Sequence, residues 1–107
     1  MKRGDLVTVA LQGSHGKPRP ALIVQGDAFE TSHVAVLLIT SLARDAPLMR
    51  VAIPATAATG LMAPSFAMLD RITTAPRDKV RAVIGRVDEA TMLTVSRLMA
   101  VFLGLAG

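Results

Sequence analysis

The sequence predicts a mainly β domain, a small curved β-barrel or sandwich of about six to seven strands, with one C-terminal helix packed on it. Six short segments rich in Val, Ile, Leu and Thr follow one another, separated by turn residues. One longer segment with apolar residues at helical spacing comes after them. The chain has 107 residues and is 51% hydrophobic, which suffices for one core, so we expect a single domain over residues 1–107.

The first three strands are expected at residues 5–11, 21–25 and 33–41. In the first, Val7, Val9 and Leu11 alternate with other residues and therefore share one side. Glycines and a proline in "QGSHGKP" mark the loop that follows. The third segment, "HVAVLLITS", is the most apolar, and this places it at the centre of the sheet.

The next three strands are expected at residues 48–54, 66–75 and 81–87. The fourth alternates between two faces until Pro54 ends it, because proline cannot continue a strand ladder. In the sixth strand, "RAVIGRV", Gly85 is expected to mark a bulge or bend, since glycine inside a strand usually does so.

The last segment, "DEATMLTVSRLMAVFLG", predicts a helix over residues 88–104. Asp88 is a suitable N-cap, and Gly104 stands where a C-terminal glycine belongs. Apolar residues recur at helical spacing and cover nearly every side of the helix. We therefore expect the helix either to be deeply buried or to turn one face toward a partner subunit.

Charge and composition point to an anionic partner. The formal net charge is +4, and nucleic acid is the commonest partner of basic domains. The chain has three phenylalanines but no Tyr or Trp. Proteins that bind single strands usually stack bases on aromatic rings. We therefore expect affinity to come from phosphate contacts and hydrogen bonds.

Several classes of chemistry are excluded by the residue types. The chain has no cysteine, so it forms no disulfide, uses no thiolate and holds no Cys-ligated zinc. Its two histidines are far apart and have no carboxylates at a metal-binding spacing, so we expect no metal and no cofactor. The chain shows no signal peptide and no run long enough to cross a membrane, which predicts a cytoplasmic protein.

Arg19 is the first candidate for chemistry, because it stands between Pro18 and Pro20 at the start of a strand. The two prolines restrict the backbone around it to extended geometry. A permanently charged guanidinium that is held in this way suits a phosphate group. The alternative is a turn whose arginine is merely solvated or paired with a carboxylate.

Further candidates lie at strand ends and inside one strand. Thr40 and Ser41 end the most apolar strand, where their hydroxyls would either bond a phosphate or base or simply cap the strand locally. Asp70 interrupts an apolar strand and needs a partner there. It would act as a base or form an ion pair, and the sequence suggests three partners: Arg71, Arg19 or Arg77.

The loop before Arg19 carries His15 and Lys17. An imidazole beside cations is able to exchange protons near neutral pH, although an idle surface histidine is the simpler interpretation. The other basic residues are scattered along the chain, and their spacing does not show whether they share a face.

Several stretches resemble the MazF/PemK (Kid) toxins of bacterial toxin–antitoxin modules. They are "RGDLVTVAL", "GKPRPALIVQGD", "LLITSL", the segment from "PLMRVAIP" to "MLDRITTAPRDKV", and the closing "IGRVDEATMLTVSRLMAVFLGL". Together they cover nearly the whole chain in the right order. The resemblance implies an SH3-like β-barrel and a homodimer. It also implies a bacterial, metal-independent endoribonuclease that cleaves single-stranded mRNA, and an antitoxin partner with a flexible, acidic tail.

The resemblance assigns roles to the candidates. Attack of the ribose 2′-hydroxyl on the adjacent phosphate would leave a cyclic phosphate and a 5′-hydroxyl. Arg19 would stabilise the transition state and is a candidate acid, Thr40 would bond the phosphate, and Asp70 would be the base or a substrate contact. Related proteins carry an arginine two residues before this aspartate, whereas this chain has Met68 there.

The resemblance also implies contacts to the substrate, which we expect from four residues: His15, Lys17, Ser41 and Arg71. The loops around residues 12–18 and 43–48 would set the cleavage sequence. Two other readings stay open. One is a non-enzymatic toxin of the CcdB kind that poisons DNA gyrase, although that kind acts through C-terminal residues that typically include a tryptophan. The other is a catalytically silent RNA-binding relative.

Overall fold

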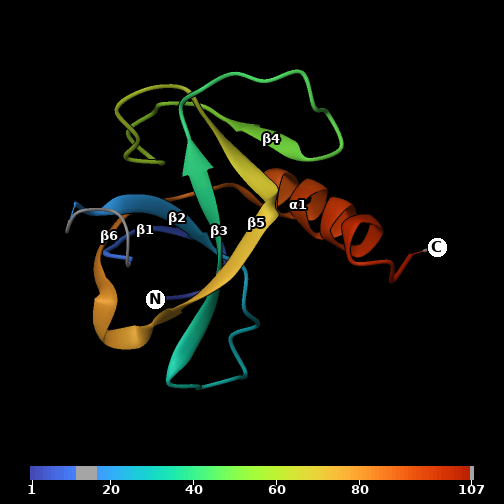
Figure 1. The fold of residues 1–107 in the computed structure, drawn as a ribbon. Coiled ribbons are helices and arrows are strands. Elements are labelled where there is room, and N and C mark those ends of the chain that lie inside the picture. The colour runs from blue at the N-terminus through green and yellow to red at the C-terminus, as the bar shows by residue number, and fades with distance from the viewer. Residues whose placement is uncertain (12–16, 107) are drawn as a thin grey trace.

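The structure is a computed structural model that describes residues 1–11 and 17–106. It contains six strands, one α-helix and one short 3-10 turn (Figure 1). Their bounds are β1 Asp5–Val9, β2 Arg19–Ile23, β3 His33–Thr40, β4 Arg50–Ile53, β5 Ser65–Pro76, η1 Arg77–Lys79, β6 Val80–Arg86 and α1 Glu89–Phe102. Each strand begins and ends within two residues of its predicted bounds.

The six strands form one antiparallel sheet in the order β4-β5-β3-β2-β1-β6. As predicted, the apolar β3 lies inside the sheet, between β5 and β2. The sheet curls in the manner of a barrel, with α1 on one side of it (Figure 1). It does not close within the described residues, because β4 and β6 are edge strands that do not pair with each other.

A large irregularity in the pairing of β3 with β5 accompanies this curvature. Leu37 pairs with Ile72, but Ile39 pairs with Ala67, so β3 advances by two residues while β5 advances by five. Between these two pairs β5 contains three residues more than β3, and its residues 68–71 have no recorded partner on β3. Insertions of this kind bend a strand. Beyond the bend β5 also pairs with β4, whose Arg50 lies opposite Met68.

Both faces of the sheet are apolar, which explains the continuous apolar run of β3. One face carries the helix-side core, which includes Leu22, Leu37 and Leu69 and packs against α1. The opposite face carries a second core, which includes Ala21 and Val36. Because neighbouring residues of a strand point to opposite faces, each strand that crosses both cores needs apolar residues at odd and even positions.

Helix α1 begins and ends as predicted. The Oδ1 atom of Asp88 accepts a hydrogen bond from the backbone N–H of Thr91 at 2.8 Å, and Gly104 has a φ of 76° just beyond the helix. Val95 is fully buried against the sheet, whereas Leu93 and Val101 are more than half exposed. The helix is therefore not deeply buried in the single chain, and one of its apolar sides faces outward.

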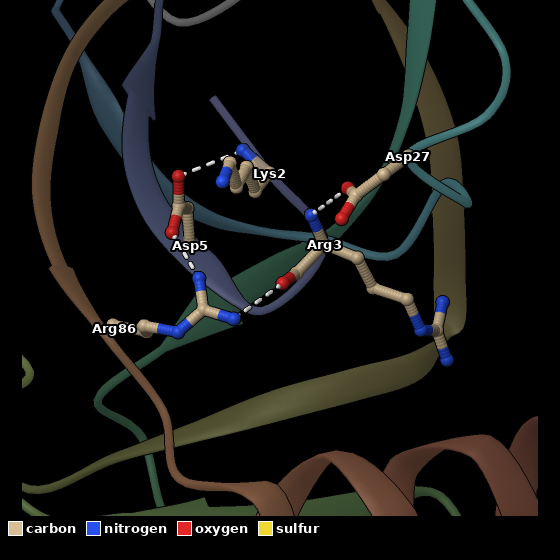
Figure 2. Close-up of polar contacts among 5 residues, drawn as sticks. All are labelled: Lys2, Arg3, Asp5, Asp27 and Arg86. Carbon is tan, nitrogen blue, oxygen red and sulfur yellow. Dashed lines mark hydrogen bonds and ion pairs between the residues drawn. The ribbon is translucent and has the colours of Figure 1, made fainter.

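A polar network ties the start of the chain to β6 (Figure 2). The guanidinium of Arg86 pairs with Asp5 at 2.7 Å and donates to the carbonyl oxygen of Arg3 at 3.1 Å. The other Asp5 oxygen accepts from the backbone N–H of Lys2 at 2.7 Å. Asp27 accepts from the backbone N–H of Arg3, also at 2.7 Å. These charged groups satisfy one another and hold β1 and the loop after β2 together.

Gly85 marks a bulge, as predicted. The register of β1 with β6 shifts there, since Leu6 pairs with Gly85 and the next residue, Val7, pairs with Val83. The turn after β4 packs its backbone directly on this point. A Cβ atom built on Gly85 would lie 2.1 Å from the carbonyl oxygen of Thr59, a distance that atoms do not tolerate. Only glycine therefore fits this approach of two backbones.

Replacement of Gly85 is expected to destabilise the protein. Gly85→Ala forces the turn and β6 apart, and overpacking of this kind costs about 1–3 kcal/mol of the free energy of unfolding. Urea denaturation followed by far-UV circular dichroism measures the loss. Gly26→Ala is the matched control, because its nearest contact would be an ordinary 3.6 Å and its backbone is not left-handed. Equal unfolding midpoints for Gly85→Ala and the parent would contradict the prediction.

Candidate active site

The strand register points to a common place for the first two candidates. β2 pairs with β3 from Ala21–Leu38 to Ile23–Val36, and if this register is extended by two residues, Arg19 comes level with Thr40. Thr40 in turn pairs with Phe66 of β5, which pairs with Ala52 of β4. We call these four residues, Arg19, Thr40, Phe66 and Ala52, the cross-strand row. Since directly paired residues of antiparallel strands point to the same face, the row lies on one face of the sheet.

This face is the one turned away from helix α1. Arg19 lies an odd number of residues before Leu22, which belongs to the helix-side core, and Phe66 is adjacent to Ala67 of the same core. Arg19 and Phe66 therefore point to the opposite face of the sheet. The row therefore continues the face of the second core, which includes Ala21. Arg19 and Thr40 lie at the ends of their strands, where this face leaves the core and reaches solvent.

Arg19 is exposed, and its side chain makes no hydrogen bond or ion pair with any residue in the described ranges. Arg19 is the first residue of β2, and Pro20 follows it inside the strand. The ladder partner of Arg19 is Val9 of β1. The backbone is thus fixed by two strands and a proline, while the guanidinium is left available to a ligand.

Thr40 is partly exposed, and its side chain caps the end of its own strand. Its Oγ1 atom accepts a hydrogen bond from the backbone N–H of Leu42 at 3.1 Å, which is the local capping considered as the alternative reading. A hydroxyl that accepts one bond still has its own O–H to donate. The capping bond therefore orients the Thr40 oxygen without using its hydrogen. Ser41 is exposed beside it.

Asp70 pairs with an arginine that the sequence analysis did not name. Its Oδ1 atom lies 2.6 Å from Nη1 of Arg50, and this replaces the three suggested partners Arg71, Arg19 and Arg77. The Arg50 side chain is 8% exposed and that of Asp70 is 29% exposed, so the pair is largely shielded from water. Arg71 is exposed, and Arg77 instead donates from Nε to a backbone carbonyl.

The register explains this pairing. Arg50 lies directly opposite Met68, and Asp70 follows two residues later on the same strand. Met68 occupies the position where the resemblance to some PemK-like toxins led us to look for an arginine. The structure therefore shows no pairing along the strand but supplies the arginine from the neighbouring strand β4. The sequence signal for Arg50 was a cation inside the apolar stretch "MRVAI", which must find a partner when buried.

The environment of Asp70 lowers its affinity for a proton. Burial acts to raise the pKa of the carboxyl, but the hydrogen bond and the charge of Arg50 outweigh it, and Arg44 adds a smaller effect. The pKa of Asp70 consequently lies below its usual value. Asp70 is thus a carboxylate at neutral pH, and a carboxylate of low basicity is better suited to accepting hydrogen bonds than to removing a proton.

The remaining candidates border the row or fall outside the described residues. Lys17 is exposed two residues before Arg19. Arg44 follows β3 and acts on Asp70, which places its charge near that carboxylate. Arg71 is exposed in the bend of β5. His15 lies outside the described residues. Phe66 was not singled out from the sequence, because its place beside Thr40 depends on the register of β3 with β5.

A cavity of about 780 Å³ lies apart from these residues. It is lined by the polar network of Figure 2 and by one side of α1, including Met92 and Ser96. The guanidinium of Arg3 donates there to the carbonyl oxygen of Val24 and to Oγ of Ser96. Its arginines are therefore already engaged, unlike Arg19. Across residues 1–11 and 17–106, no helix is long and apolar enough to span a membrane.

Comparison with known proteins agrees with this geometry. A family model described as "PemK-like, MazF-like toxin of type II toxin-antitoxin system" matches residues 2–103. The chain is 46% identical, over the full length of both proteins, to a "Probable endoribonuclease MazF" of Mycolicibacterium smegmatis.

Solved structures share the fold. One is an endoribonuclease in complex with its cognate antitoxin from a mycobacterial species, with a TM-score of 0.79, 25% identity, and 98% of this chain and 96% of that chain covered. Another is the Mycobacterium tuberculosis toxin MazF-mt6, with a TM-score of 0.81, 22% identity, and 94% and 97% covered. The predicted barrel-like fold and the predicted family are both confirmed. The chain belongs to the PemK-like, MazF-like toxins of type II toxin–antitoxin systems and is a homologue of an endoribonuclease.

Proposed function

We propose that this toxin cleaves single-stranded RNA, including mRNA, without a metal ion, by attack of a ribose 2′-hydroxyl on the adjacent phosphate. The observation that carries the proposal is the cross-strand row. It presents an unengaged guanidinium, Arg19, beside a hydroxyl that keeps its hydrogen to donate, Thr40. Two such donors side by side fit two oxygens of one phosphate group.

The reaction needs charge stabilisation more than any other assistance. The 2′-oxygen forms a bond to phosphorus, the bond from phosphorus to the 5′-oxygen breaks, and a cyclic phosphate and a 5′-hydroxyl result. Negative charge grows on the phosphoryl oxygens in between. Arg19 would meet this charge with its planar fork, and the hydroxyl of Thr40 would donate to one of the same oxygens. The proline-restricted backbone keeps the guanidinium in place before the reaction begins.

Asp70 is a candidate for the base or for a substrate contact. The hydrogen bond and the charge of Arg50 lower the pKa of this carboxyl and so favour its carboxylate form, which accepts hydrogen bonds. We therefore assign Asp70, held by Arg50, to substrate contact. His15 is of the residue type suited to proton transfer near neutral pH. Lys17, Ser41 and Arg71 would contribute contacts around the reacting phosphate.

We further propose the partners that are usual for such a toxin. A solved relative is an endoribonuclease in complex with its cognate antitoxin. A net charge of +4 favours an antitoxin with an acidic, flexible tail. The outward apolar side of α1, with Leu93 and Val101, would be covered in a homodimer or by the antitoxin. The cytoplasm is the compartment in which mRNA is available as substrate.

Arg19→Ala is expected to lower the cleavage rate by about 10²–10³-fold, the usual effect of removing one donor that stabilises transition-state charge. The assay incubates a long single-stranded RNA with the protein in EDTA and maps the new ends. Arg97→Ala, which removes an exposed arginine of α1, is the matched control and should cleave like the parent. Arg19→Lys keeps the charge but loses the fork, so its rate should fall between the two.

Equal cleavage by Arg19→Ala and the parent would remove Arg19 from the site. Intact RNA with the parent itself would overturn the ribonuclease proposal. In that case a gyrase supercoiling assay and an RNA-binding assay would separate the poison and the silent relative. Loss of all cleavage in EDTA, with recovery on adding Mg²⁺, would contradict the metal-independent mechanism.

Arg50→Ala is expected to destabilise the protein in a pH-dependent way. The folded-state pKa of Asp70 is lowered, so the pair contributes stability above the unfolded pKa of about 3.9 and loses it as the pH falls through the folded value. Without Arg50 the carboxylate is left uncompensated. We expect a loss of about 2 kcal/mol at pH 7, less than for a fully buried pair because Asp70 is 29% exposed.

At about pH 2, below the unfolded pKa and far into the range where the folded carboxyl takes up its proton, the same substitution should cost clearly less, because a protonated Asp70 needs no cation. Urea denaturation at pH 7 and at about pH 2 compares the two conditions. Arg50→Lys should keep most of the stability at neutral pH, since it retains a charge at this position. An equal loss at both pH values would show that Arg50 acts through packing and not through Asp70.

A further inference from the structure

We infer that Phe66 is a stacking platform for a nucleobase next to the scissile phosphate. The inference deepens the proposed function and rests on it for the identity of the ligand. It replaces the expectation, drawn from composition, that this chain binds RNA through phosphate contacts and hydrogen bonds without an aromatic ring.

The position of Phe66 carries the first part of the inference. It pairs directly with Thr40, and Thr40 comes level with Arg19 when the recorded register of β2 with β3 is extended by two residues. Adjacent strands are about 4.8 Å apart, so Phe66 stands about 10 Å across the sheet from Arg19, on the same face. A phosphate held between Arg19 and Thr40 therefore has an aromatic ring beside it, at one strand's distance from the hydroxyl.

The burial of Phe66 carries the second part. Its side chain is partly exposed, and it belongs to neither of the two core clusters. The strand neighbour on its other side, Ala52, is exposed and ends in a single methyl group. A large apolar ring that belongs to neither core cluster and has a small neighbour keeps part of its surface for a ligand.

The other two phenylalanines do not share this position. Phe29 is 68% exposed in the loop after β2, and Phe102 is 44% exposed at the end of α1. Neither belongs to the cross-strand row. The chain has no tyrosine and no tryptophan, so Phe66 is the aromatic side chain that the described residues place beside Arg19 and Thr40.

Charges in the segments next to Arg19 and Thr40 favour RNA as the occupant. Arg19, Lys17 and Arg44 are exposed and have no hydrogen-bonded or ion-paired side-chain partner in the described ranges, although the charge of Arg44 acts on Asp70. Exposed cations together with a partly exposed aromatic ring match a single-stranded nucleic acid, in which phosphates alternate with flat bases. An acidic peptide would pair with the cations but would offer no flat base to stack on the ring.

The base would stack on the ring equally well in the bound substrate and in the transition state. Phe66 should therefore act on binding and not on the chemical step. Loss of one base–aromatic stack costs enough affinity to raise KM roughly 5- to 100-fold. Phe66→Leu should therefore raise KM by this factor and leave kcat within about twofold of the parent. Arg19→Ala, in contrast, lowers kcat, so the two effects are separable.

Phe66→Trp offers a direct test, because it introduces the sole tryptophan of the chain. The indole keeps an aromatic surface at this position, on which a base is able to stack. The ligand is the 2′-deoxy analogue of an RNA that the parent cuts, which lacks the attacking hydroxyl. Stacking of a base on the indole should quench its fluorescence as the oligonucleotide is added. Phe29→Trp is the matched control and should not be quenched.

The inference is overturned if Phe66→Leu leaves KM unchanged while its circular dichroism spectrum matches the parent, or if the Phe66→Trp fluorescence does not respond to the bound oligonucleotide. If the parent does not cut RNA, the long RNA itself is used in the titration. Quenching without cleavage would retain the platform and overturn the nuclease. Neither cleavage nor quenching would overturn both.

Discussion

The three extra residues in β5 opposite β3 determine where the candidate side chains of the site lie relative to one another. On one side of the irregularity β5 follows β3 in the ordinary register, and on the other it pairs with both β3 and β4. This arrangement puts Phe66 beside Thr40, Met68 opposite Arg50, and Asp70 in the bend. With one inserted residue fewer, every side chain beyond the bend would point to the opposite face, because neighbouring strand residues alternate.

Local patterns were enough to predict the elements but not their arrangement. The helix bounds followed from Asp88 and Gly104, whose capping depends only on nearby backbone, and the bulge at Gly85 followed from one glycine inside an apolar strand. The order of the strands and the open edges at β4 and β6 depend on contacts between distant segments. Periodicity carries no information about these contacts, and the prediction of a barrel or a sandwich stayed correspondingly coarse.

The same distinction between local signals and long-range contacts applies to the candidate site. Arg19 and Thr40 became candidates because a proline-flanked arginine and a strand-end hydroxyl are visible locally. The partner of Asp70 was predicted wrongly, because Arg50 lies 20 residues away and reaches the carboxylate only through the pairing of β4 with β5. The three suggested arginines looked equally suitable by charge. Charge alone does not distinguish them, whereas register does.

The arginines of this chain fall into two groups, and Arg19 belongs to the group whose guanidinium is not engaged by the protein. Arg3, Arg50, Arg77 and Arg86 donate to protein oxygens, so their guanidinium groups hold the fold together. Such a group would have to break an existing bond before it could meet a substrate. Arg19 has no such bond among the described residues, while its backbone is fixed by β1 and Pro20. The backbone thus positions the cation, and its guanidinium breaks no protein hydrogen bond when a phosphate binds. Preorganised stabilisation of a transition state requires such a group.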